Sequence, residues 1–152
     1  MATETAVAQR RAEVKWEGDL RQGKGVVSLM SGAAKDLPVT WAARTEEPDG
    51  KTSPEELIAG AHAACYAMAL SNTLAQEGSP PERLLIEATC SLTPQESGYR
   101  ITSVELSVRA SIKGLDAMRF EQLAQKAELG CPVSNALRNN VKIILRPELE
   151  PV

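Results

Sequence analysis

The chain has 152 residues, of which 43% are apolar and 24% are charged, with 17 basic and 20 acidic side chains. This composition is typical of one globular domain, whose core needs no metal or disulfide support at this length. The net charge of -3 argues against a nucleic acid or an anionic membrane as the main partner, and three cysteines are too few for a secreted disulfide scaffold. The N-terminus has no apolar signal segment, and no apolar run approaches the roughly 20 residues of a membrane span. We therefore expect a cytoplasmic protein.

The first third of the chain predicts short β-strands. Apolar and charged residues alternate over residues 12–17, and a Gly-Asp turn follows. Residues 26–30 and 39–43 are two further candidate strands, and an acidic Pro-Asp-Gly turn follows the second. We expect a single domain over residues 1–152, with residues 1–11 as a flexible or swapped N-terminal arm.

A long helix is predicted over residues 54–76. Ser53 suits the N-cap, Pro54 suits the first helical position, and Glu56 completes a capping box. The middle of the helix is rich in alanine and glycine, and it is apolar on most of its faces. Such a helix is typically central, with other elements packed closely against it.

The second half of the chain predicts two strands, two helices and a last strand. In chain order they cover residues 84–92, 101–112, 115–129, a short helix opening at 131–134, and 141–145. Gly98, between the two strands, suits a hairpin turn. Strands grouped on either side of a helix, rather than alternating with helices, favour an α+β fold with antiparallel sheets.

The three cysteines differ in their predicted surroundings. Cys65 lies inside the alanine-rich helix, where a free cysteine is most often a small buried apolar residue. Cys131 stands beside a predicted helix start, where free N–H groups and the helix dipole favour a thiolate, although an unreactive N-cap is an equal alternative. Cys90 falls on the apolar face of a strand, so we expect it to pack in the core.

Three further residues are candidates for chemistry. His62 precedes Cys65 by three residues on one helix face, and a thiol hydrolase pair is conceivable there, but a structural histidine is favoured because a rigid helix rarely aligns such groups for proton transfer. Glu55 either complements the helix dipole or is a surplus, functional carboxylate. Arg44 either pairs with the neighbouring acidic turn at the surface or serves a site. With one histidine and no C-x-x-C, the usual histidine and cysteine metal sites are excluded.

Two motifs together carry a resemblance to a known family. The stretch TSPEELIAGAHAACYAMALS, followed much later by GCPVSNAL, resembles the osmotically inducible protein C / organic hydroperoxide resistance (OsmC/Ohr) family. The stretch KWEGDLRQGKGVVSLMSG resembles the OsmC branch, and the resemblance extends from about Trp16 to Leu145. It implies an α+β fold with antiparallel sheets, a central cysteine-bearing helix, and an intertwined homodimer with two active sites at its interface.

The resemblance also implies an activity and its residues. It implies a thiol peroxidase that reduces organic hydroperoxides and, less well in the Ohr branch, hydrogen peroxide, in defence against oxidative or osmotic stress. Cys65 would be the peroxidatic cysteine and Cys131 the resolving one. Glu55 matches the family's active-site glutamate and Arg44 the arginine of the OsmC branch, with Arg21 as the fallback. An external dithiol, with a lipoyl group as one candidate, would restore the thiols, and neither metal nor flavin cofactor is implied.

Physical chemistry adds two conditions to this hypothesis. Burial should raise the pKa of Cys65, so a cation must lie against its sulfur, which is the role of Arg44 held by Glu55. On one unbroken helix Glu55 and Cys65 are about 15 Å apart along the axis. Either the helix breaks near Gly60, or the glutamate and arginine come from a partner chain.

Two other classes of function stay open. A thiol hydrolase would use Cys65 with His62 and would cleave acyl esters. A non-enzymatic dimer would bind a small apolar ligand between its subunits, with Cys65 and Cys131 packed and inert.

Overall fold

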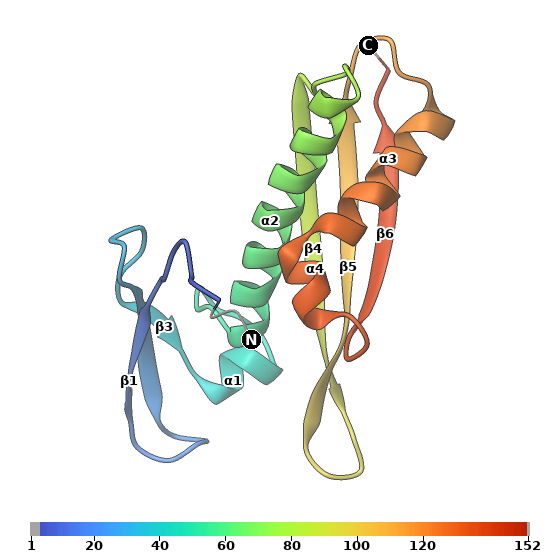
Figure 1. Ribbon diagram of the computed structural model, residues 1–152. Coiled ribbons are helices and arrows are strands. Elements are labelled where there is room, and N and C mark those ends of the chain that lie inside the picture. The colour runs from blue at the N-terminus through green and yellow to red at the C-terminus, as the bar shows by residue number, and fades with distance from the viewer. Residues whose placement is uncertain (1–3, 152) are drawn as a thin grey trace. The chain divides into compact units, whose positions relative to one another are not determined.

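The computed structural model describes residues 4–151, and Figure 1 shows its helices and strands. The chain divides into two compact units, one ending at Pro54 and the other beginning at Glu55. The expected single domain over residues 1–152 therefore stays a prediction. Of the expected N-terminal arm, residues 1–3 lie outside the described residues, whereas residues 4–11 are exposed and form neither helix nor strand.

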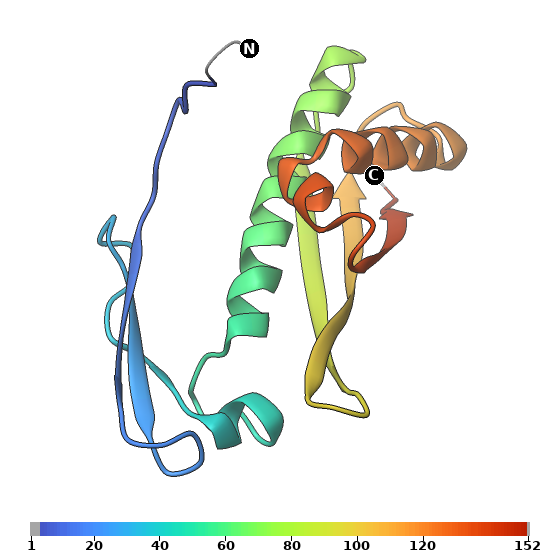
Figure 2. The ribbon, with the colours of Figure 1, turned by 60° about the horizontal axis from the view of Figure 1, so that its bottom comes forward.

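The N-terminal unit is a small antiparallel sheet followed by a short helix. In chain order its elements are β1 (Ala12–Glu17), β2 (Lys24–Leu29), β3 (Leu37–Val39) and α1 (Trp41–Thr45). β2 is the middle strand of the sheet, and Figure 2 shows it beside β1. Trp16 of β1 is paired with Gly25 of β2, and a Cβ at Gly25 would lie 2.7 Å from the Trp16 ring. Glycine is thus needed at this position for the indole to lie across β2.

The strand predicted over residues 39–43 is wrong beyond its first residue. β3 ends at Val39, and the chain turns into helix α1 at Trp41. Thr40 is extended, and its Oγ1 accepts a hydrogen bond from the N–H of Ala43 at 3.1 Å, so it caps the helix. A short apolar run is ambiguous between strand and helix, and here the threonine cap decides in favour of the helix.

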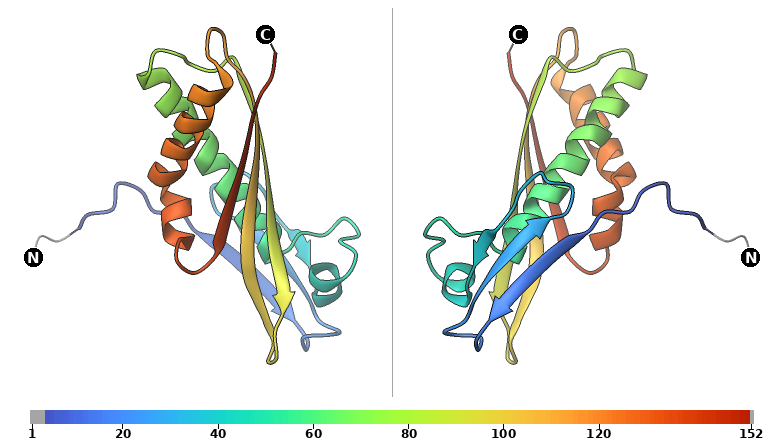
Figure 3. Two further views of the ribbon diagram at one scale, coloured as in Figure 1. Left: turned by 90° about the vertical axis from the view of Figure 1, so that its right-hand side faces the viewer. Right: turned by 90° about the vertical axis from the view of Figure 1, so that its left-hand side faces the viewer.

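The C-terminal unit packs three helices on one face of a three-stranded sheet. In chain order its elements are α2 (Pro54–Gln76), β4 (Arg83–Pro94), β5 (Tyr99–Ser111), α3 (Ala117–Gly130), α4 (Pro132–Leu137) and β6 (Lys142–Leu149). Figures 1 and 3 show α2 and α3 on the same side of this sheet. The α+β class is confirmed, and so are the two long strands, the helices and the last strand.

The second sheet is mixed rather than purely antiparallel. β4 and β5 form the predicted hairpin, in which Gly98 has a φ of 80° and accepts a hydrogen bond from the N–H of Gln95 at 2.9 Å. β6, however, runs parallel to β5. The helices α3 and α4 carry the chain back along the sheet between these two strands, which a parallel pair requires.

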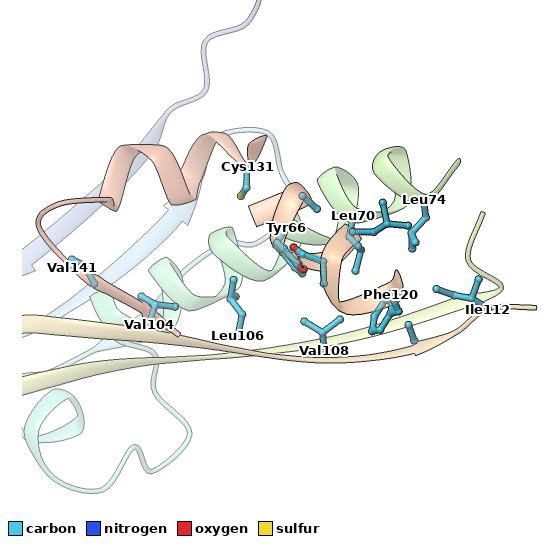
Figure 4. Close-up of a cluster of buried hydrophobic side chains, with 14 residues drawn as sticks. Tyr66, Leu70, Leu74, Val104, Leu106, Val108, Ile112, Phe120, Cys131 and Val141 are labelled. Carbon is cyan, nitrogen blue, oxygen red and sulfur yellow. Dashed lines mark hydrogen bonds between the residues drawn. The ribbon is translucent and has the colours of Figure 1, made fainter. Parts of the chain in front are cut away.

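The core lies between the sheet and the helices, as Figure 4 shows. Alternate residues of β5 supply one wall, and residues at helical spacing on α2 and α3 supply the other. The buried side chains include Val104, Leu106 and Val108 from β5, Tyr66, Leu70 and Leu74 from α2, and Phe120, Leu123 and Ala127 from α3. Cys131 belongs to this core, and Cys90 packs against it as predicted.

Helix α2 is continuous over its 23 residues and begins at Pro54, as predicted. The capping box of Ser53 and Glu56 at the start of this helix stays a prediction. Because Gly60 does not interrupt the helix, Glu55 and Cys65 are about 15 Å apart along its axis. Only one face of the helix is buried within the chain, whereas the opposite small and apolar face is exposed, including Met68 at 72%. Over residues 4–151, no helix combines the length and the apolar character needed to cross a membrane.

Candidate active site

The fold brings Cys65 and Cys131 together although they are 66 residues apart in sequence. Their Sγ atoms lie 3.4 Å from each other, and both cysteines are free thiols. A disulfide bond is about 2.05 Å long, so the two sulfurs are within about 1.4 Å of bonding distance. This pair is the arrangement that a two-cysteine redox centre requires.

Cys131 is positioned by the turn between two helices. Its N–H donates to the carbonyl oxygen of Glu128 at 3.2 Å, which ends α3, and its own carbonyl accepts from the N–H of Asn135 at 2.9 Å, which begins α4. Pro132 then occupies the first position of α4. The Cys131 side chain is fully buried, so its sulfur faces the interior and Cys65.

The surroundings of Cys65 favour the neutral thiol. Burial is the largest effect and raises the pKa of Cys65, a hydrogen bond from the backbone N–H of Val133 lowers it, and the nearby Cys131 thiol raises it again. The net direction is upward, as the sequence predicted. Within residues 55–151, none of the groups that shift this pKa is a cation.

His62 forms a buried hydrogen bond with Ser134 of α4. The Nε2–Oγ distance is 2.7 Å, and both side chains are fully buried. Burial lowers the pKa of His62, and the negative charge of Glu128 only partly opposes this effect. The ring is thus neutral at neutral pH and bonded to Ser134 rather than to Cys65. This arrangement supports the structural histidine, which the sequence favoured, over a catalytic base.

A second set of polar contacts holds the turn that carries Cys131. Arg138 donates from Nη1 to Oε2 of Glu128 at 3.2 Å and from Nη2 to the Glu128 carbonyl at 3.1 Å. That carbonyl also accepts the Cys131 N–H, so the guanidinium braces the end of α3. Sequence reasoning missed Ser134, Glu128 and Arg138. Ser134 lies between Val133 and the polar Asn135, so its local sequence gives no signal of its buried contact.

The other predicted site residues lie in three different places. Glu55 is in the first turn of α2 with 7% exposure, and its charge contributes, after burial, to raising the pKa of Cys90. Arg44 is in the last turn of α1, where its guanidinium lies 5.9 Å from the centre of the Trp41 ring, a cation–π contact. Arg21 is exposed in the turn between β1 and β2. The roles of Glu55, Arg44 and Arg21 stay predictions.

No metal centre accompanies the cysteine pair in the part of the chain that the structure describes. There, no three or more histidine, cysteine, aspartate or glutamate side chains are grouped so that they could hold an ion.

The buried neutral ring of His62 predicts that acid destabilises the fold. Because the pKa of His62 in the folded state lies below its ordinary 6.5, the unfolded chain binds the proton more readily. This contribution to stability is complete above pH 6.5 and is lost as the pH falls from 6.5 toward the folded pKa. We expect the free energy of unfolding to fall by up to about 1.4 kcal/mol per pH unit in this window.

Urea denaturation between about pH 7 and pH 5 measures this effect, with His62→Gln as the matched control. Glutamine retains an amide that can bond to Ser134 but does not titrate. The variant should lose less stability on acidification than the unaltered protein. Parallel pH dependences of the two proteins would contradict the prediction.

An α+β fold that brings two free thiols within 3.4 Å of each other defines a protein with a candidate two-cysteine redox centre. The chain belongs to the OsmC-like protein family, whose family model matches residues 47–146. The family expected from the two cysteine motifs is thereby confirmed.

Individual relatives agree with this assignment. The chain is 40% identical to peroxiredoxin OsmC of Escherichia coli (strain K12) over 134 residues, which are 88% of this chain and 93% of that protein. It is 32% identical over 131 residues to the organic hydroperoxide resistance protein OhrA of Bacillus subtilis (strain 168), covering 82% and 86% of the two chains. The higher identity to OsmC agrees with the expected branch.

The fold is similar to that of a solved family structure. The crystal structure of the organic hydroperoxide resistance protein OhrB of Bacillus subtilis superposes with a TM-score of 0.72 at 29% identity. The match covers 91% of this chain and 98% of that one. The expected OsmC/Ohr-like fold is therefore confirmed.

Proposed function

We propose that this protein is a thiol-dependent peroxidase that reduces organic hydroperoxides to alcohols, with hydrogen peroxide as a second substrate. Its role would be defence against oxidative or osmotic stress. The observation that carries the proposal is the 3.4 Å separation of the Cys65 and Cys131 sulfurs. Relatives named peroxiredoxin and organic hydroperoxide resistance protein support the same chemistry.

The reaction uses the two cysteines in turn. The Cys65 thiolate attacks one peroxide oxygen, the O–O bond breaks, and the departing alkoxide takes a proton to become an alcohol. Cys65 is then a sulfenic acid. The Cys131 sulfur attacks it, water leaves, and a Cys65–Cys131 disulfide forms. An external dithiol, for which a lipoyl group is a candidate, returns two electrons and two protons to the pair and becomes a disulfide itself.

We place the cation that stabilises the Cys65 thiolate on Arg44, oriented by Glu55. The groups of residues 55–151 that act on the pKa of Cys65 include no cation, so we assign the positive charge to a residue outside this range. Arg21 is the alternative source. Since the unbroken α2 separates Glu55 from Cys65 by about 15 Å, a site that uses both combines the glutamate of one chain with the thiol of another.

A homodimer is part of the proposal. The face of α2 that includes Gly60, Ala61, Ala64 and Met68 is exposed in the single chain, although its residues are small or apolar. It is continuous with the half-buried Cys65 on the same helix. A second copy that covers this face would remove apolar surface from water and shield the reacting sulfur.

The reduced pair must be regenerated between turnovers, so we place the protein in the reducing cytoplasm. No observation favours the thiol hydrolase, because the His62 ring is bonded to Ser134. None favours a binding module with inert cysteines, because such a module would not need the sulfurs of Cys65 and Cys131 at 3.4 Å.

Intact mass after treatment with one equivalent of an organic hydroperoxide tests the proposed function. We expect a loss of two hydrogens, the release of one alcohol, and a disulfide-linked peptide pair containing Cys65 and Cys131. Cys90→Ala should behave in the same way, since we assign Cys90, which lies in β4, no part in the reaction. Unchanged mass with unconsumed peroxide would overturn the proposal, and so would a disulfide that involves Cys90.

A further inference from the structure

The hydrogen bond between His62 and Ser134 lies next to the sulfur contacts in both sequence and space. His62 and Cys65 are three residues apart on α2 and therefore share a helix face. Val133 and Ser134 are consecutive residues of α4. The two helices are thus joined by two neighbouring links, one from His62 to the Ser134 hydroxyl and one from the Val133 N–H to the Cys65 sulfur.

Helix α4 depends on such links for its position. It has only six residues, and an isolated helix of this length is not stable in water. Its N-cap is Cys131, whose side chain makes no capping hydrogen bond. Tertiary contacts must therefore fix where the helix begins. The His62–Ser134 bond is 2.7 Å long and excluded from solvent, so it is well suited to this task.

The start of α4 sets two quantities that the redox reaction uses. One is the placement of the Val133 N–H, the one group within residues 55–151 that favours a negative Cys65 sulfur. The other is the position of Cys131, which is the N-cap of the same helix and lies 3.4 Å from Cys65. A group that fixes α4 against α2 therefore acts on both the first thiol and the second.

We propose that His62 and Ser134 are a positioning pair, whose hydrogen bond holds the Val133 N–H and Cys131 against the sulfur of Cys65. Neither residue touches the peroxide. Without the bond, the start of α4 moves relative to α2, the Cys65 thiolate loses its N–H donor, and the two sulfurs meet less often. This inference rests on the proposed function for its biological meaning, but its physical content concerns the free thiols alone.

The test measures the Cys65 thiol directly. The full-length reduced protein is alkylated with iodoacetamide over a range of pH, and the rate at Cys65 is followed by peptide mass. In Ser134→Ala we expect the midpoint of this pH profile to rise, so that the rate below the midpoint falls about tenfold for each unit of rise. His62→Leu should raise the midpoint as well. His62→Gln should keep the pH profile of the unaltered protein, because the glutamine amide can donate to Ser134.

A second measurement follows the pairing of the sulfurs. Equilibration with a dithiothreitol redox buffer gives the stability of the Cys65–Cys131 disulfide, and we expect it to fall several-fold in Ser134→Ala and His62→Leu. The double variant should resemble either single variant, because both remove the same bond. Near-ultraviolet circular dichroism checks that each variant is folded. If Ser134→Ala does not fold, the comparison of His62→Leu with His62→Gln decides.

The outcomes separate this inference from the proposed function. An alkylation profile of Ser134→Ala that superposes on that of the unaltered protein would overturn the positioning pair, and so would a His62→Gln profile equal to that of His62→Leu. Failure of the unaltered protein to consume peroxide would overturn the peroxidase instead. The alkylation and disulfide measurements need no peroxide, so each result is assigned to one hypothesis.

Discussion

Replacing Cys65 with serine is expected to reduce peroxide turnover more than about a thousandfold, because removal of a reacting nucleophile costs orders of magnitude in rate. A serine hydroxyl is not ionised near neutral pH and is a far weaker nucleophile than a thiolate. The substitution changes one atom of a half-buried side chain, so the fold should be retained. The measurement is consumption of an organic hydroperoxide in the presence of excess dithiol.

Cys90→Ala is the matched control for this experiment. Cys90 packs against the core from β4, and we assign it no part in the reaction, so its loss should leave turnover unchanged. Substantial activity in Cys65→Ser would show that the Cys65 sulfur takes no part in the reaction. The peroxidase mechanism would then have to be abandoned, whatever the distance between the two sulfurs.

Replacing Cys131 with serine is expected to leave the first step intact and remove the second. Cys65 should still reduce one equivalent of hydroperoxide, since its sulfur remains in place. Without the neighbouring thiol, however, the sulfenic acid cannot close to a disulfide and is open to further oxidation. In excess hydroperoxide without a dithiol, the variant should gain two or three oxygens on Cys65, whereas the unaltered protein should stop at the disulfide.

Intact mass and peptide mapping distinguish these products. The first oxidation should release alcohol rapidly in an amount equal to the protein, and each further oxygen gained should release one more equivalent of alcohol. If the variant instead resisted over-oxidation as well as the unaltered protein does, Cys131 would not be the resolving residue. In that case the 3.4 Å distance between the Cys131 and Cys65 sulfurs would reflect core packing and not a step of the reaction.

Local sequence signals predicted most of the elements correctly. Proline at the first position marks the start of α2, and the alternation of apolar residues predicts β1 and the buried face of β5. These signals act within a few residues of the chain, so they can be read without a tertiary structure. Where two local signals competed, as between the apolar run after Val39 and the cap at Thr40, the prediction of a strand was wrong.

Contacts between segments that are far apart in the chain were harder to predict from the sequence. The parallel pairing of β6 with β5 depends on how α3 and α4 return across the sheet, and nothing within β6 itself indicates its direction. The role of Ser134 was missed for the same reason, since its hydrogen-bond acceptor or donor, His62, is 72 residues away. A buried serine in a short helix carries no local mark of its distant contact.

By itself, the sequence determined the family, the α+β class and the two cysteines that could react, because motif, periodicity and capping are properties of neighbouring residues. Only the tertiary structure decided that Cys65 and Cys131 lie side by side and that α2 is unbroken. It also decided that the Val133 N–H bonds to the Cys65 sulfur and that His62 bonds to Ser134, each contact joining α2 to α4. The physical reason is that packing of α3 and α4 against α2 sets distances between groups far apart in the chain. Chemistry between two sulfurs depends on distances of a few ångström, which no pattern of residues along one strand or helix specifies.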